Sequence, residues 1–191
     1  MKVAYIVFDG VTTLDFAGVH EAIPWMLVLG AHKDLSWDFC ATKEEITDDR
    51  GLTMKVGRVR PDLSEYDVVF FSGGMPTRQL RFDEDFVDWL RTARNARIKA
   101  SVCTGSLLLG AAGFLEGKRA TTNPSAYELL APYCAEVVRD ERCVRDGNVF
   151  TGGAATTSVD VGLSVVEALT DAAFARRVQD IIQYPFYRAS L

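Results

Sequence analysis

The chain has 191 residues, a length that fits a single domain over residues 1–191 better than two very small ones. Apolar residues make up 48% and charged residues 25% of it, which excludes a wholly disordered chain, and 15 Gly and 6 Pro are too few for a fibrous protein. The net charge of −5 is not that of a nucleic-acid-binding protein, so we expect no nucleic-acid partner.

The apolar runs are shorter than the about 20 residues that cross a bilayer. The apolar stretch within residues 1–10 is too short for a signal peptide, and no small-residue cleavage site follows it. We therefore expect a cytoplasmic protein without a membrane partner. None of the four cysteines forms a C-x-x-C pair, which argues against a zinc site and favours free thiols: Cys40, Cys103, Cys134 and Cys143.

The first third of the chain predicts two strands separated by a helix. Residues 3–8 are continuously apolar, as in a strand covered on both faces. Residues 15–29 have apolar side chains at near-helical spacing, and Pro24 predicts a kink or a break there. Residues 35–41 predict a second strand, and residues 42–66 a small hairpin or excursion.

The middle of the chain repeats this alternation. Residues 67–71 predict a buried strand that ends at Ser72-Gly73-Gly74, and residues 83–97 an amphipathic helix. Residues 98–103 predict a third buried strand, followed directly by an almost wholly apolar core helix over residues 105–115.

The last third contains shorter elements and two closing helices. We expect a short strand ending at residues 121–122, a short helix over residues 125–130, and two strand pieces around an Asp-Gly-Asn turn. Two helices, over residues 156–169 and 171–183, close the chain, and Asp171 caps the second. Alternating strands and helices predict an α/β fold with a mostly parallel sheet and helices on both faces.

Three predicted strands end in segments that suit a functional site: Asp9-Gly10, Ser72-Gly73-Gly74 and Cys103-Thr104-Gly105. In open parallel sheets, ligands bind beyond the carboxyl ends of the strands. We therefore expect the site where these three segments meet.

Cys103 lies where a buried strand turns directly into a helix, which is the thiol version of a nucleophile elbow. Such a turn strains the backbone and directs the helix N-terminus at the sulfur, so we expect a lowered thiol pKa and a nucleophilic thiolate. Gly105 allows the turn to close. The alternative is an ordinary core cysteine, the reading that we favour for the other three.

Gly73 and Gly74 follow their strand with backbone N–H groups that can form an oxyanion hole, although Gly-Gly after a strand is often only a turn. Histidine is scarce. His20 lies on the first helix and His32 in the polar loop after it, where we expect it at the surface; neither follows the Cys103 helix, which argues against a Cys–His triad.

Asp15 is the better partner for Cys103, because it follows the first strand and so lies near the other strand ends. Burial and a neighbouring thiolate would raise the pKa of its carboxyl group, which could then donate a hydrogen bond to sulfur and move a proton. The equally weighted alternative is a helix N-cap.

Motifs along nearly the whole chain point to one family: Leu14-Asp15-Phe16-Ala17-Gly18, Ser72-Gly73-Gly74, Ser101-Val102-Cys103-Thr104-Gly105-Ser106, Arg119-Ala120-Thr121-Thr122 and Thr151-Gly152-Gly153. The sequence resembles the ThiJ/PfpI superfamily, relatives of class I glutamine amidotransferases. Within it the chain is most similar to the isonitrile hydratase branch, and also to the amidotransferase-like domain of certain AraC-type regulators.

This resemblance implies a flavodoxin-like three-layer α/β sandwich that forms homodimers. It implies catalytic roles for Cys103, Asp15 and Thr104 in hydrating a small isonitrile to an N-substituted formamide through a thioimidate, with no metal or other cofactor. Thr104 would orient the intermediate together with the Gly73 and Gly74 amides. A non-catalytic domain that binds a small ligand or senses oxidation at Cys103 is the alternative, and amide hydrolysis is a third.

One position departs from the family, because Asn123 stands where relatives often have His. The loss of that imidazole counts against Cys–His chemistry and less against a hydratase built on Asp and Cys. His20 is also unusual for the family and could point into the pocket. The expected pocket walls are Met75, Pro76, the residues around Asn123 and Pro124, and residues 154–156.

Overall fold

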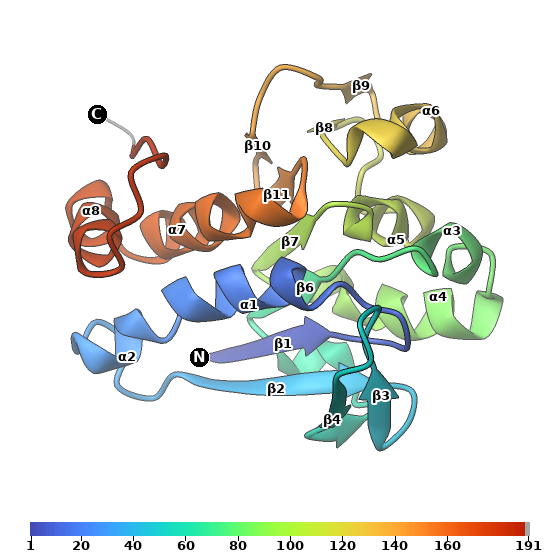
Figure 1. The fold of residues 1–191 in the computed structure, drawn as a ribbon, viewed down its shortest axis with the longest axis horizontal. Helices are drawn as coiled ribbons and strands as arrows, with labels where there is room; N and C mark the ends of the chain where they lie inside the picture. The colour runs from blue at the N-terminus through green and yellow to red at the C-terminus, as the bar shows by residue number, and fades with distance from the viewer. Residues whose placement is uncertain (190–191) are drawn as a thin grey trace.

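A seven-stranded sheet forms the centre of the protein in the computed structural model, which describes residues 1–189 (Figure 1). Only its first edge pair is antiparallel, and all other neighbours pair in parallel. Across the sheet the strands are β10 (Cys143–Asp146), β11 (Val149–Gly152), β7 (Ile98–Val102), β6 (Val68–Phe71), β1 (Lys2–Ile6), β2 (Ser36–Ala41) and β5 (Arg58–Val59). The mostly parallel sheet predicted from the sequence is confirmed.

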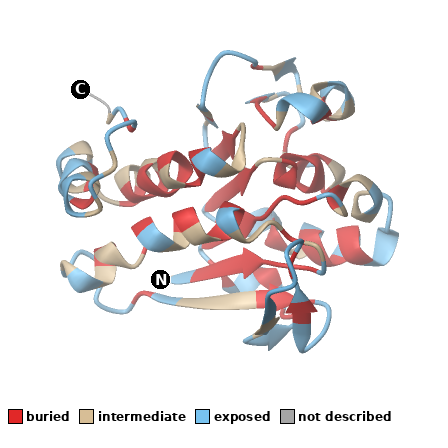
Figure 2. Cartoon of the chain, viewed as in Figure 1, coloured by how far each residue is buried: buried red, intermediate tan, exposed pale blue. Residues whose placement is uncertain are grey.

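The three central strands are buried on both faces, which explains the apolar runs of β1 and β6 and the burial of Lys99 and Ser101 in β7 (Figure 2). Their register pairs Ile6 with Phe71 and Phe71 with Ser101. The carboxyl ends of β1, β6 and β7 are therefore level, and the segments that follow them meet at one edge of the sheet.

Helices cover both faces of the sheet. The β1–β2 and β6–β7 connections run in opposite directions across it, and right-handed crossovers therefore place their helices on opposite faces. The helix α1 (Thr13–Ala22) packs against α7 (Ser158–Leu169), which in turn packs against α8 (Ala172–Ile181). On the other face α4 (Glu84–Arg91) packs against α5 (Gly105–Ala111). The expected flavodoxin-like sandwich is confirmed.

Three predicted helices differ clearly in their bounds, and one of them is α4, which ends at Arg91 rather than at residue 97. The first predicted helix is broken at Pro24, as expected, and continues as α2 (Trp25–Val28). It begins at Thr13, two residues before the predicted start, so that Asp15 lies inside its first turn. The core helix α5 ends at Ala111 rather than at residue 115, and Gly113 adopts a positive φ of 84° just beyond it.

The remaining elements are short. The hairpin predicted within residues 42–66 forms, but β5 from the same segment joins the central sheet, which the sequence did not predict. These elements are β3 (Glu45–Thr47), β4 (Thr53–Lys55), α3 (Thr77–Leu80), β8 (Arg119–Ala120), α6 (Tyr127–Leu130) and β9 (Glu136–Val137). Among residues 1–189, no helix combines the length and the apolar character that crossing a bilayer requires.

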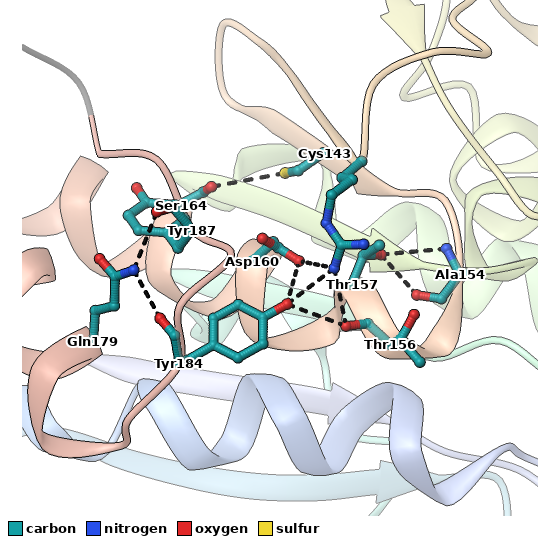
Figure 3. Close-up of polar contacts among 10 residues, drawn as sticks. Cys143, Ala154, Thr156, Thr157, Asp160, Ser164, Gln179, Tyr184 and Tyr187 are labelled. Carbon is teal, nitrogen blue, oxygen red and sulfur yellow. Dashed lines mark hydrogen bonds and ion pairs between the residues drawn. The ribbon is translucent and has the colours of Figure 1, made fainter.

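A polar cluster holds the C-terminal segment and the β11–α7 loop in place (Figure 3). The Asp160 carboxylate of α7 accepts hydrogen bonds from Arg142, at 2.8 Å, and from the Tyr184 hydroxyl, at 2.7 Å. The carbonyl of Arg142 accepts the N–H of Gly153, which comes directly after β11. Because Gly152 contacts the Cys103 turn, this cluster fixes the scaffold behind the site.

Candidate active site

Cys103 occupies a strained turn between β7 and α5. Its φ is +54°, in the left-handed region that residues with a side chain rarely adopt. The backbone is held on both sides, because its N–H donates to the Gly152 carbonyl at 3.0 Å and its carbonyl accepts the hydroxyls of Thr122 and Ser106, at 2.9 and 3.2 Å. The strained turn predicted from the sequence is confirmed, and these contacts stabilise it.

Gly105 allows α5 to start directly after this turn. A Cβ atom at residue 105 would lie 2.1 Å from the carbonyl oxygen of Phe71 in β6. No side chain fits there, so glycine permits the close approach of helix and sheet that aims the α5 N-terminus at the site.

Asp15 is fully buried and points at the neighbouring strand end. Its Oδ2 accepts the Gly73 N–H at 2.8 Å, and its Oδ1 has no hydrogen-bond partner within residues 1–189. The N-cap of α1 is Thr12, so the alternative of Asp15 as a helix cap is wrong. The carboxyl group is held by an adjacent strand end instead of by its own helix.

The carboxyl group, the thiol and the start of α5 meet around Gly73. A Cβ atom there would lie 2.4 Å from Asp15 Oδ2, 2.8 Å from the Thr104 nitrogen and 3.0 Å from Cys103 Cβ. The missing side chain leaves room for these three groups to approach one another. The segments after β6 and β7 thus meet at one place, as expected. Of the segment after β1, Gly10 lies against Gly74, but the Asp9 carboxylate pairs with Lys43 and lines a different cavity.

The two glycine N–H groups are engaged by the protein itself. Gly73 donates to Asp15, and Gly74 donates to the Thr104 hydroxyl at 3.0 Å, which is also 3.0 Å from the Gly74 carbonyl. Buried amides require such partners. The predicted open oxyanion hole is therefore wrong for this structure, and the glycines position Asp15 and Thr104.

Burial raises the pKa of Asp15 to about 7, with the nearby charge of Asp49 acting in the same direction and the Gly73 hydrogen bond opposing both. The direction is the predicted one. The charge responsible is Asp49, however, not a neighbouring thiolate.

Burial also raises the pKa of the Cys103 thiol, to about 11, and the charge of Asp15 adds to the rise. Hydrogen bonds from Thr104 and from the Asn123 side chain lower it by less. The prediction of a lowered thiol pKa is wrong, because desolvation outweighs the turn and the helix N-terminus. At neutral pH the proton is on sulfur, and a carboxylate with a pKa near 7 lies close by.

Ser125 fixes the Asn123 side chain near Cys103. The Asn123 amide oxygen accepts two hydrogen bonds from Ser125, from its N–H at 3.0 Å and its hydroxyl at 2.8 Å, which leaves the NH₂ group to donate elsewhere. A hydrogen bond from this side chain lowers the pKa of the Cys103 thiol. A neutral amide, not an imidazole, therefore stands near the thiol.

A cavity of about 130 Å³ opens beside Cys103. Its wall includes Met75, Asn123 and the neighbouring Ser125, as expected, and also Arg78, which the sequence analysis missed. Two expected walls are wrong: Pro76 lines a different cavity of about 560 Å³, and residues 154–156 line neither of the two.

The histidines lie outside this site. The ring of His20 packs against Tyr5, Trp37 and Phe39, and burial lowers its pKa. The idea that His20 points into the pocket is therefore wrong. His32 is half-buried and approaches the Leu169 carbonyl, rather than lying free at the surface. Over residues 1–189, no three His, Cys, Asp or Glu side chains are arranged to hold a metal ion.

The raised pKa of Asp15 predicts a pH-dependent loss of stability. Between the unfolded pKa near 4 and the folded pKa near 7, the unfolded chain releases this proton first, so stability falls as the pH rises. Asp15→Asn removes this effect. We expect the variant to gain roughly 2–3 kcal/mol over the native chain between pH 5 and pH 8 in urea unfolding. A pH-independent difference would contradict the buried carboxyl group.

The DJ-1/PfpI family model matches residues 1–168. An isonitrile hydratase from Pseudomonas putida is 36% identical over 185 residues, which cover 96% of this chain and 78% of that protein. A ThiJ/PfpI family protein from Pseudomonas syringae superimposes with a TM-score of 0.83 at 30% identity, over 100% of this chain and 78% of that one. Drosophila melanogaster DJ-1beta, at 18% identity, shares the fold with a TM-score of 0.82 over 97% and 98% of the two chains.

Proposed function

Because this chain belongs to the DJ-1/PfpI family, we propose that it is a hydratase that converts a small isonitrile into an N-substituted formamide. The observation that carries this proposal is the meeting of Asp15 and Cys103 around Gly73, in a chain similar to an isonitrile hydratase. The homodimer and the cytoplasmic location expected from the sequence are part of the proposal.

The first step adds the thiol to the terminal isonitrile carbon. The Asp15 carboxylate takes the proton of Cys103 as the sulfur attacks, and then delivers it to the same carbon. A C–S and a C–H bond form, one C–N π bond is lost, and the product is a thioimidate, R–N=CH–S–Cys. The pKa of Asp15, about 7, lies below the pKa of the thiol, about 11, so above pH 7 the carboxylate is ionised and can act as this base.

The second step hydrolyses the thioimidate and regenerates the free Cys103 thiol. Asp15, again a carboxylate, accepts a proton from a water molecule as the water oxygen attacks the thioimidate carbon. Asp15 then passes that proton to the thioimidate nitrogen. The C–S bond then breaks as the formamide carbonyl forms, and the hydroxyl proton returns to sulfur through Asp15. The hydrogen bonds from Asn123 and Thr104 to the sulfur stabilise the charge that develops when it leaves.

The alternative of a redox sensor receives less support from the site. Oxidation by peroxide requires a thiolate. Burial and the charge of Asp15 keep the Cys103 sulfur protonated at neutral pH. An enzyme that moves the thiol proton only when substrate is bound fits this environment better.

The direct test is to incubate the purified chain with a panel of alkyl and cycloalkyl isonitriles and to follow formamide by NMR. We expect N-substituted formamide in amounts equal to the isonitrile consumed, with multiple turnovers per chain. A Cys134→Ala variant is a matched control, because that thiol is half-buried outside the cavity. Absence of formamide across the panel would overturn the proposed function.

A further inference from the structure

We propose that Arg78 binds a carboxylate on the substrate, so that this site selects small isonitriles carrying a negative charge. That the substrate is an isonitrile rests on the proposed function. That it carries a negative charge rests on the residues that line the cavity. Arg78 is the one charged side chain on the described wall of the Cys103 cavity. The Asp15 carboxyl group is fully buried next to Gly73 and Cys103 and is not among the exposed side chains that line this cavity.

The Arg78 guanidinium has only neutral partners. It donates to the Ser125 hydroxyl at 3.0 Å and lies 3.4 Å from the Met75 sulfur. No carboxylate of residues 1–189 lies within ion-pair distance of it. By contrast, the guanidinium groups of Arg119 and Arg142 each pair with a carboxylate. A half-buried guanidinium that faces a cavity without a counter-ion is suited to an anionic ligand.

Hydrogen bonds along the cavity wall lead from the cation toward the nucleophile. Arg78 donates to Ser125, whose hydroxyl donates to Asn123 at 2.8 Å, and Asn123 and Cys103 line the same cavity. These bonds hold the guanidinium on the wall that also contains the reacting sulfur. A substrate that reaches both groups would have its isonitrile carbon and its anionic group held at opposite ends.

The volume limits the length of such a substrate. The cavity of about 130 Å³ is well below the roughly 300 Å³ at which drug-sized pockets begin. A carboxylate matches the two-pronged geometry of a guanidinium group. The class that fits is therefore a short isocyano carboxylate, with isocyanoacetate as the simplest probe and its methyl ester as the neutral counterpart.

The first test compares kcat/KM for isocyanoacetate and for its methyl ester. In the native chain we expect the ratio to favour the acid, and in Arg78→Gln we expect it to fall about 10- to 100-fold, mainly through KM for the acid. Arg78→Lys should retain part of the preference. Arg97→Gln is the matched control, since Arg97 is exposed just before β7, at the opposite end of that strand from Cys103.

A second readout does not depend on isonitrile turnover. Iodoacetate and iodoacetamide alkylate a thiol in the same way but differ in charge, so the ratio of their rates at Cys103 reports on Arg78. We expect Arg78→Gln to lower the iodoacetate-to-iodoacetamide ratio at least about 5-fold and Arg97→Gln to leave it unchanged. A lower alkylation ratio in Arg78→Gln, together with no turnover of any isonitrile by the native chain, would support the anion site and overturn the proposed hydratase activity. Unchanged ratios in both experiments would overturn the role of Arg78.

Discussion

Cys103→Ala is expected to lower kcat/KM for an isonitrile by about 10⁴-fold or more, because it removes the atom that forms the C–S bond. Water would then have to attack the isonitrile directly, and the hydrogen bonds from Asn123 and Thr104 would have no sulfur to stabilise. Formamide production, measured by NMR at several substrate concentrations, gives this ratio.

Two controls keep this result specific to the nucleophile. Cys134→Ala removes a half-buried thiol that bonds the Leu130 carbonyl and does not line the Cys103 cavity, and it should turn over isonitrile at the native rate. Circular dichroism should show that Cys103→Ala still folds, since alanine has no bulk to add to the turn. Activity of Cys103→Ala within about 10-fold of the native chain would contradict a covalent role.

The pH dependence of kcat/KM is expected to be set by Asp15. The active form of the pair has one proton shared between the Asp15 carboxylate and the Cys103 thiol. Below a pH of about 7 a second proton occupies Asp15, so activity should rise with pH up to that value and level off above it. It should fall again only near the thiol pKa of about 11.

Asp15→Asn removes the group that titrates near pH 7 and the only base that the proposed mechanism uses. We expect kcat/KM to fall about 10²- to 10⁴-fold and the rising limb to disappear. Thr13→Ser, in the same turn of α1, retains the hydroxyl that bonds Asp48 and serves as a control. A rising limb that persists in Asp15→Asn would assign the titration to another group.

Much of this architecture follows from simple patterns in the sequence. Continuous apolar runs predict β1 and β6 because these strands are buried on both faces, and Pro24 correctly predicts the break between α1 and α2. Parallel register then brings the segments after these strands to one edge. That reasoning alone places Asp15 close to Cys103.

The electrostatics of the site could not be predicted from the same patterns. The position of Cys103 at a helix N-terminus suggested an acidic thiol, but the balance depends on how much solvent the folded chain removes. The partners of Gly73 and Gly74 likewise depend on side chains that approach from α1 and α5. Sequence spacing contains no information about either effect.

Arg78 was missed for a related reason. It lies on α3, an element of four residues that is too short to show a periodic pattern. Its importance comes from Ser125 and Asn123, which lie more than forty positions further along the chain and share its cavity. A basic residue shortly after Ser72-Gly73-Gly74 was the one available signal.

A single-turnover experiment tests the central claim, that Cys103 attacks the isonitrile carbon, most directly. Excess chain is mixed with isonitrile labelled with ¹³C at the terminal carbon, quenched in acid at successive times, and digested for mass spectrometry. The account predicts that the peptide containing Cys103 gains the mass of one isonitrile and then loses it as labelled formamide appears. Formamide that forms while this peptide remains unmodified at every time point would contradict it.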